Sequence, residues 1–397
     1  MPRRRRARSG GIVLFITVLL IILGVFYSLT GINVGGIFDV TVTPSPIGSS
    51  AIPTSTAFQP NTSPSGTWWE VYFTDPLTIN DPNNIAGSIE QKLIDRINAA
   101  QTSIHIASFE FDLTPVAEAL IAAHKRGVDV RWVTDDEYGL EADLDPGNGQ
   151  FKMLQDAGIE VRSDTRGALM HNKFWIFDGQ TLWTGSTNIT KSGIFVQDNN
   201  TIVFFSPELA AIYEREFQEM WNGDFGPRSP SQLNEQSLVL HGTPIQVIFT
   251  SEDPALETAI IPIVNGATSS IRFLAFSFTD YPLANAMIQR AQQGVKVSGI
   301  IDKTQSGGQG SELGTLFCAR VPVRQDGNPQ FMHNKIIIVD ERYVITGSLN
   351  FSTSAEEEND ENVIIIDNSE IARLYTQDFD RVWGQGTDPD PAKITCQ

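Results

Sequence analysis

Two copies of one polar pattern are the residues best suited to chemistry in this sequence of 397 residues. The first copy runs His171-Asn172-Lys173, Asp178 and Gly185-Ser186-Thr187-Asn188, and the second runs His333-Asn334-Lys335, Asp340 and Gly347-Ser348-Leu349-Asn350. All spacings agree, and the copies stand 162 residues apart. Imidazole can act as nucleophile or general acid near neutral pH, Lys offers charge for phosphate oxygens, and Asn adds a directed donor. This set suits attack on a phosphodiester, with one histidine attacking phosphorus and the other protonating the leaving oxygen.

The doubled pattern resembles the motif of the phospholipase D superfamily, and the resemblance covers about residues 80–385. It implies that both motifs meet between two domains in a single active site. It also implies a covalent phosphohistidine intermediate, with no metal or cofactor required. The residues implied to contact the phosphoryl group are His171, Lys173, Asn188, His333, Lys335 and Asn350.

Family usage further implies a carboxylate after each motif that holds the histidine ring. Glu361 stands 28 residues after His333, whereas Asn199 stands at the same distance from His171. A carboxylate favours protonated imidazole. We therefore assign His171 as the nucleophile and His333, with Glu361, as the general acid. The neighbouring Asp198 is an alternative source of the carboxylate that the first copy lacks.

Four further polar residues of the motifs are candidates with two possible roles. Asp178 and Asp340 are counted with the catalytic group, yet each stands where a hairpin turn begins, which equally suits a structural role. Ser186 and Ser348 are candidates either for substrate contact or for support of the local backbone.

The elements that position these residues follow from apolar patterning. In each copy His and Lys share one face of a strand, because side chains i and i+2 point the same way. Ile89, Leu93 and Ile97 recur at helical spacing, and β-rich runs alternate with such helical patterns. We predict an α/β fold with substantially parallel sheets. It would form two similar domains, residues 68–235 and 243–397, packed face to face in a monomer.

The N-terminal segment predicts a membrane attachment. Residues 1–9 contain five Arg and would form a basic cytoplasmic tip, and residues 10–32 form an apolar run without charge in its core. This run predicts one transmembrane signal anchor, with a cleaved signal peptide as the alternative. Residues 33–67, rich in Pro, Ser and Thr, would form a linker. The positive-inside bias then places the body outside the cytoplasm.

Charge narrows the choice of phosphodiester. Five of the 28 basic residues lie within residues 1–8, so the remainder carries 23 basic against 47 acidic residues, a net charge of −24. A nucleic-acid substrate is therefore disfavoured. We expect phospholipid hydrolysis or head-group exchange, with an endonuclease, a cardiolipin synthase-like transferase and an inactive binding module as alternatives. Cys318 and Cys396 could form one disulfide or remain two free thiols.

Overall fold

The computed structural model describes residues 68–231 and 236–396, which belong to one compact unit, Phe58–Gln397. The predicted basic tip, membrane anchor and linker lie outside the described residues. Within the described ranges, no helix is both long enough and apolar enough to cross a membrane. We call residues 68–231 the first half and residues 236–396 the second half. The boundaries predicted for two domains, 68–235 and 243–397, stay a prediction.

The first half contains a seven-stranded sheet in the order β1-β7-β6-β5-β2-β3-β4. Its strands are β1 (Trp69–Phe73), β2 (Ser103–Ser108), β3 (Asp129–Thr134), β4 (Glu160–Ser163), β5 (Lys173–Phe177), β6 (Thr181–Gly185) and β7 (Asn200–Phe205). β2, β3 and β4 pair in parallel, and the other neighbours pair in antiparallel fashion.

The second half repeats this arrangement in an eight-stranded sheet, in the order β12-β11-β10-β13-β14-β15-β9-β8. Its strands are β8 (Ser237–Leu240), β9 (Thr243–Thr250), β10 (Ser270–Ala275), β11 (Lys296–Ile301), β12 (Val323–Gln325), β13 (Lys335–Val339), β14 (Tyr343–Gly347) and β15 (Glu361–Asp367). Again only the run β10, β11 and β12 is parallel.

The α/β class is confirmed, but the expectation of substantially parallel sheets is wrong. Each half has one run of three parallel strands, joined by segments that contain helices, and its other strands pair in antiparallel fashion. A tight turn can only join antiparallel neighbours, so the hairpin at Asp178-Gly179 commits β5 and β6 to antiparallel pairing. The turn at Asp340-Glu341 does the same for β13 and β14.

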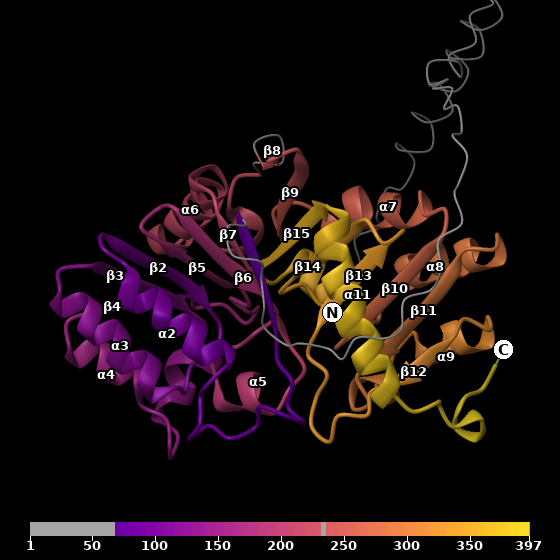
Figure 1. Cartoon of the computed structure of the whole chain (residues 1–397), viewed down its shortest axis with the longest axis horizontal. Coiled ribbons are helices and arrows are strands. Elements are labelled where there is room, and N and C mark those ends of the chain that lie inside the picture. Colours follow the sequence, from indigo (N-terminus) through magenta and orange to yellow (C-terminus); the bar gives the residue numbers. More distant parts are fainter. Residues whose placement is uncertain (1–67, 232–235, 397) are drawn as a thin grey trace, which may run out of the picture. The chain divides into compact units, whose positions relative to one another are not determined.

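Helices cover the outer faces of the sheets and fill the space between them (Figure 1). The helices of the first half are α2 (Ile89–Ala99), α3 (Thr114–Lys125), α4 (Gln150–Asp156), α5 (Lys191–Phe195) and α6 (Pro207–Asn222). Those of the second half are α7 (Ile261–Asn265), α8 (Tyr281–Gln292), α9 (Leu313–Cys318), α10 (Thr353–Glu357) and α11 (Ser369–Gln385). Short π- and 3₁₀-turns connect them, including Asp136–Glu141 and Ala142–Leu144 after β3.

One hydrophobic cluster joins the two halves. Phe174 and Ile176 of β5 and Ile336 and Ile338 of β13 all belong to it, together with buried side chains of α6 and α11. The intervening residues of β5 point to the opposite side, where Trp175 is buried in a second cluster with α2, α3 and α4. This alternation is the period expected of strands that are covered on both faces. The shared cluster holds the two sheets in one fixed arrangement, which the active site needs.

A disulfide joins Cys318, at the end of α9, to Cys396. Of the two states that the sequence leaves open, the structure therefore has the paired one. The bond ties the segment after α11 back to the rest of the second half.

Candidate active site

Backbone contacts across the two halves bring the motifs together. Met170 forms an isolated parallel bridge with Asp360, and Asp198 forms the equivalent bridge with Met332. The residue after each methionine is the histidine of a motif, His171 or His333. The N–H of His171 donates to the carbonyl of Asp360 at 2.9 Å, and the N–H of His333 donates to the carbonyl of Asp198 at 2.8 Å. Each motif is thus positioned by a strand start in the other half.

Each histidine ring is held by a side chain from the opposite half. Nδ1 of His171 lies 2.7 Å from Oε2 of Glu361. Nδ1 of His333 lies 3.1 Å from Oδ1 of Asn199 and 3.2 Å from the carbonyl oxygen of Ser186. The predicted pairing of Glu361 with His333 is therefore corrected: Glu361 pairs with His171. Counting residues within one copy cannot predict this pairing, because the residues at the starts of β7 and β15 contact the histidine of the other half.

The serine hydroxyls fix these ring partners. Ser186 Oγ donates to Oδ1 of Asn199 at 2.8 Å. Ser348 likewise hydrogen-bonds Glu361, which partly opposes the rise that burial causes in the pKa of that carboxyl. The sequence leaves two roles open for Ser186 and Ser348, substrate contact or structural support. The contacts of both serines fit structural support. Asp198 does not replace the missing carboxylate, since it pairs with Arg381 at 2.9 Å.

The lysines lie beside the rings. Lys173 Nζ donates to the carbonyl of His171 at 2.8 Å, and Lys335 Nζ donates to that of His333 at 2.8 Å. Each ammonium stands 4.9 Å from the centre of a phenylalanine ring, Phe109 or Phe276 respectively. Both lysines are almost fully buried. Burial lowers the pKa of Lys173 to about 8, and burial with the neighbouring Lys173 ammonium lowers the pKa of Lys335 well below its usual value.

The two histidines, the two lysines and Glu361 form one cluster, because the charges of the lysines shift the pKa of the other groups. Burial and the ammonium groups of Lys173 and Lys335 lower the pKa of both His171 and His333 well below its usual value. Burial raises the pKa of Glu361 to about 7 despite the two lysines. The site therefore has positive character and is prepared for a bound phosphate.

Asn188 and Asn350 close the motifs. Asn188 Nδ2 donates to Oε2 of Glu110 at 2.6 Å, while Oδ1 of Asn188 and Oδ1 of Asn350 are buried without a hydrogen-bond partner among the described residues. The glycine that begins this segment is required by backbone crowding. Gly185 has φ +149°, and a Cβ there would lie 2.3 Å from the carbonyl oxygen of Asn200.

Asp178 and Asp340 are placed outside this cluster, which corrects their inclusion in the catalytic group. Each follows the five residues of β5 or β13, so it lies on the order of 16 Å along the strand from the lysine. Asp178 accepts hydrogen bonds from the N–H groups of residues 101–103, and Asp340 from those of residues 268–270. Both carboxylates thus fasten a hairpin turn to the start of the neighbouring strand.

Sequence reasoning missed the middle residue of each H-N-K motif. Asn172 and Asn334 are fully buried and accept hydrogen bonds from Asn362 and Asn200 at 2.9 and 2.8 Å, respectively. These contacts again cross between the halves. The signal was present, since both asparagines recur in both copies, but a polar residue between two charged ones on a strand gives no hint of its partner.

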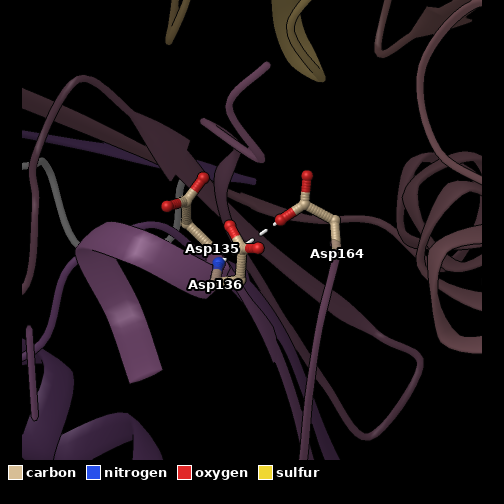
Figure 2. Close-up of side chains that lie close together, drawn as sticks. All are labelled: Asp135, Asp136 and Asp164. Atoms are coloured by element: carbon tan, nitrogen blue, oxygen red, sulfur yellow. Dashed lines mark hydrogen bonds between the residues drawn. The ribbon is translucent and has the colours of Figure 1, made fainter. Parts of the chain in front are cut away.

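Three carboxylates near the site, Asp135, Asp136 and Asp164, have ligand atoms within 4.8 Å of one another (Figure 2). Each of the two buried ones already has protein partners. Asp135 accepts from the N–H of Met170 at 3.1 Å, and Asp164 pairs with Arg166 at 3.3 Å. Asp302 accepts from the N–H of Met332 in the same way. Asp135 and Asp302 thus hold the residue before each histidine, a positioning role that the sequence alone did not reveal.

A protein-family model described as "Cardiolipin synthase, PLD-like domain" matches residues 93–221 and again residues 260–383, more than half of the chain. The protein therefore belongs to this family of phospholipase D-like domains, and the resemblance inferred from the doubled motif is confirmed. The two matches correspond to the two halves.

Individual relatives match one part of the chain. Human mitochondrial cardiolipin hydrolase is 40% identical over 129 residues, 32% of this chain and 50% of that protein. A phospholipase D of Rickettsia conorii is 38% identical over 116 residues, 29% of this chain and 58% of that protein. The chain thus spans about half the length of the curated relatives it matches.

Among solved structures, phosphatidylserine synthase of Haemophilus influenzae covers 75% of this chain and 83% of its own, with a TM-score of 0.55 and 14% identity. This likeness concerns the fold alone and extends over both halves. Nuc of Salmonella typhimurium, a phospholipase D family member, covers 37% of this chain and 98% of its own, with 31% identity and a TM-score of 0.35.

Proposed function

We propose that the protein is a phospholipase D-type phosphodiesterase. It would release the head group of a phospholipid by hydrolysis, through a covalent phosphohistidine intermediate. The observation that carries this proposal is the meeting of two His-x-Lys pairs with each ring held at Nδ1. Holding Nδ1 leaves Nε2 of both rings for the reaction, and two lysines supply charge for the phosphate oxygens. The names of the relatives, cardiolipin hydrolase and phospholipase D, support a lipid substrate.

The ring partners favour His333 as the nucleophile, which reverses the assignment made from the sequence. A carbonyl oxygen can only accept a hydrogen bond, so the contact with Ser186 requires the proton of His333 to sit on Nδ1. Nε2 then carries the lone pair that attacks phosphorus. The lowered pKa of His333, caused by burial and the nearby ammonium groups, keeps this lone pair available at neutral pH.

The same reasoning favours His171 as the general acid. Because burial raises the pKa of Glu361 to about 7, the Glu361–His171 pair holds a shared proton near neutral pH. Whether that proton sits on the carboxyl or on Nδ1, the ring can present an N–H at Nε2 to the leaving oxygen. When the bond between phosphorus and the leaving oxygen breaks, the proton on Nε2 of His171 passes to the departing alcohol. His171 can then take a proton from water, which attacks phosphorus and frees His333.

A phosphatidyl transferase is the second candidate, supported by the description of the matching family model as a cardiolipin synthase domain. The same site would carry out this reaction if an alcohol replaced water in the second step. The ratio of transfer to hydrolysis depends on whether an alcohol or water enters the site.

We also propose that the body works outside the cytoplasm, attached to a membrane by residues 10–32, and as a monomer. The disulfide between Cys318 and Cys396 supports an oxidising compartment. Both motifs needed for one site lie in one chain, so no second copy is required to complete it.

The direct test is an assay series on the full chain in detergent, with phosphatidylcholine, phosphatidylglycerol and plasmid DNA, each with excess chelator. We expect release of a soluble head group and phosphatidic acid, and a loss on the order of 10⁴-fold in the His333→Ala variant. His124→Ala, on α3, is the matched control and should keep wild-type activity. DNA cleavage without lipid turnover would overturn the proposal, as would full activity in His333→Ala.

A further inference from the structure

A pocket of about 240 Å³ opens beside the first-half motif. We call it the Tyr138 pocket. Its lining comes from the segments that follow β2 and β3 and from the start of α5, and includes Glu110, Asp112, Tyr138 and Asp143. Its volume is below the roughly 300–1,000 Å³ of drug-sized pockets, so it suits a small alcohol rather than a second lipid.

Aromatic rings connect this pocket to His171. Tyr138, which is 45% exposed, stacks in a tilted arrangement on Phe109 at 5.2 Å between ring centres. Phe109 in turn meets the ring of His171 edge-on at 4.8 Å. The pocket therefore lies one ring away from the histidine that would protonate the leaving oxygen.

A carboxylate connects the pocket to the phosphate-binding groups. Glu110 lines the pocket and accepts a hydrogen bond from Asn188 at 2.6 Å, one of the side chains that would contact the phosphoryl group. The second half has Ser277 at the position of Glu110, so the acidic group belongs to one side of the site alone. The two sides of the cleft thus offer different chemistry to the two substituents of a phosphodiester.

The charges around the pocket are predominantly negative. Glu110, Asp112 and Asp143 line it. Both oxygens of Asp143 accept hydrogen bonds from the N–H groups of residues 149, 151 and 152. Glu110 and Asp112 each use one oxygen to accept, from Asn188 and from the N–H of Lys191 respectively, which leaves the other oxygen of each for a ligand. Burial raises the pKa of both Glu110 and Asp112, and this rise is opposed by the charge of Lys173 at Glu110 and by the backbone N–H and charge of Lys191 at Asp112.

We propose that the Tyr138 pocket binds the leaving head group and selects one that carries a positively charged amine. This inference rests on the proposed function. An ammonium is attracted both by carboxylates and by the face of an exposed tyrosine ring, a combination that recognises choline-like cations. Proton transfer from His171 to the alcohol oxygen would release the head group directly into this pocket.

The test compares head groups at a fixed surface charge. Phosphatidylcholine, phosphatidylethanolamine and phosphatidylglycerol with the same acyl chains are each diluted into an excess of neutral detergent, and kcat/KM is measured with the full chain. We expect Glu110→Gln, which keeps the shape and can still accept from Asn188, to lower kcat/KM for the two amine lipids by about tenfold. Turnover of phosphatidylglycerol should change less than about threefold.

A matched control removes the same charge elsewhere. Glu257 is exposed and lines a different acidic pocket in the second half, so Glu257→Gln should leave all three rates unchanged. Tyr138→Leu should weaken selection for phosphatidylcholine in the same direction as Glu110→Gln. An equal loss on all three lipids in Glu110→Gln, or a wild-type preference for phosphatidylglycerol, would overturn the proposal while leaving the proposed function intact.

A second readout does not depend on lipid cleavage. Hydrolysis of bis(4-nitrophenyl) phosphate is measured with increasing choline chloride against sodium chloride at equal ionic strength. We expect choline to inhibit the wild type and to need about tenfold higher concentration with Glu110→Gln, whereas glycerol should not inhibit. If lipids are not cleaved at all, the proposed function fails while this assay still tests the pocket. Absence of choline inhibition, or equal inhibition by glycerol, would overturn the pocket's proposed ligand.

Discussion

At the scale of single residues, the two histidines differ mainly in what faces Nδ1. Each ring has a backbone carbonyl beside it, Ser186 for His333 and Ser348 for His171, but His333 meets the amide oxygen of Asn199 whereas His171 meets the carboxyl group of Glu361. Both rings share nearly equal burial, and both have a lysine and a phenylalanine beside them. The difference between nucleophile and general acid is thus reduced to one side-chain pair, Asn199 against Glu361. A nearly symmetric cluster can in this way give its two halves different chemical roles.

This difference predicts a bell-shaped dependence of kcat/KM on pH. The acid limb should lie below pH 6.5, because His333 must be unprotonated and burial with the ammonium groups lowers its pKa. On the basic side, activity should fall between about pH 7 and 8. The Glu361–His171 pair loses its shared proton as pH rises through about 7, and Lys173 loses its charge near 8. Measurement with a short-chain soluble phospholipid from pH 4 to 9 gives both limbs.

Glu361→Gln is the matched variant for this profile. Without the carboxyl group the proton on His171 is opposed by burial and both lysines, so the basic limb should move to lower pH by about one unit or more. The acid limb should stay where it is. A profile that keeps its basic limb in this variant would count against a proton held by the Glu361–His171 pair.

At the scale of elements, the strand termini do most of the positioning. β5 and β13 begin at Lys173 and Lys335, and the opposite ends of the same strands are fastened by Asp178 and Asp340. Partial burial acts to raise the pKa of Asp340, but hydrogen bonds from the N–H groups of residues 268–270 outweigh it and lower that pKa. An ionised carboxylate thus secures the hairpin turn at one end of each strand, and the lysine of the H-N-K motif lies at the other end.

Separation along the strand predicts that these aspartates affect stability rather than chemistry. Asp178→Asn and Asp340→Asn should each reduce the free energy of unfolding by about 1–2 kcal/mol, as for the loss of a capping carboxylate. The folded-state pKa is lowered, so the contribution of Asp340 is present at neutral pH and is lost as pH falls below about 4. Denaturant unfolding at pH 7 and pH 3 measures this. A drop in kcat/KM of a hundredfold or more in a folded variant would instead return these residues to the catalytic group.

Much of this element-level arrangement could be predicted from the sequence, and its failures have physical causes. The helix over Ile89–Ala99 and the strands after each H-N-K motif follow from local periodicity, and both are present. The partners of the rings could not be predicted this way. Counting 28 residues from His333 locates Glu361 along the chain, but a strand's register with the opposite half decides which histidine it meets. The contacts of Glu110 could not be predicted this way either, because they depend on Asn188 and on a pocket formed by distant segments.

At the scale of the whole molecule, the opposite halves are interdependent. Asn172 bonds Asn362, Asn334 bonds Asn200, and both histidine partners cross between halves. Two further crossings are ion pairs, Arg166 with Asp360 and Arg381 with Asp198. Buried polar contacts of this kind are costly when only one side is present. The halves should therefore fold and act together rather than as separable domains.

The disulfide gives a prediction at this scale. Its cysteines are 78 residues apart in sequence, so pairing restricts the unfolded chain considerably. Cys318→Ser with Cys396→Ser, or reduction of the wild type, should reduce the free energy of unfolding by about 2–4 kcal/mol. Activity of the folded protein should persist, because the bond lies in the second half away from the motifs. Thermal unfolding with and without reductant measures the effect, and an unchanged Tm would contradict it.

The most direct test of the central claim is to trap the phosphorylated intermediate and locate it. A substrate with a good leaving group, such as 4-nitrophenyl phosphodiester, is mixed with the full chain and quenched in alkali, which preserves phosphohistidine, and the modified peptide is identified by mass spectrometry. A phosphoryl group on His333 that still carries the second ester substituent, with accumulation in His171→Ala and none in His333→Ala, is the predicted result. Phosphate on His171, or no phosphohistidine during active turnover, would contradict the account.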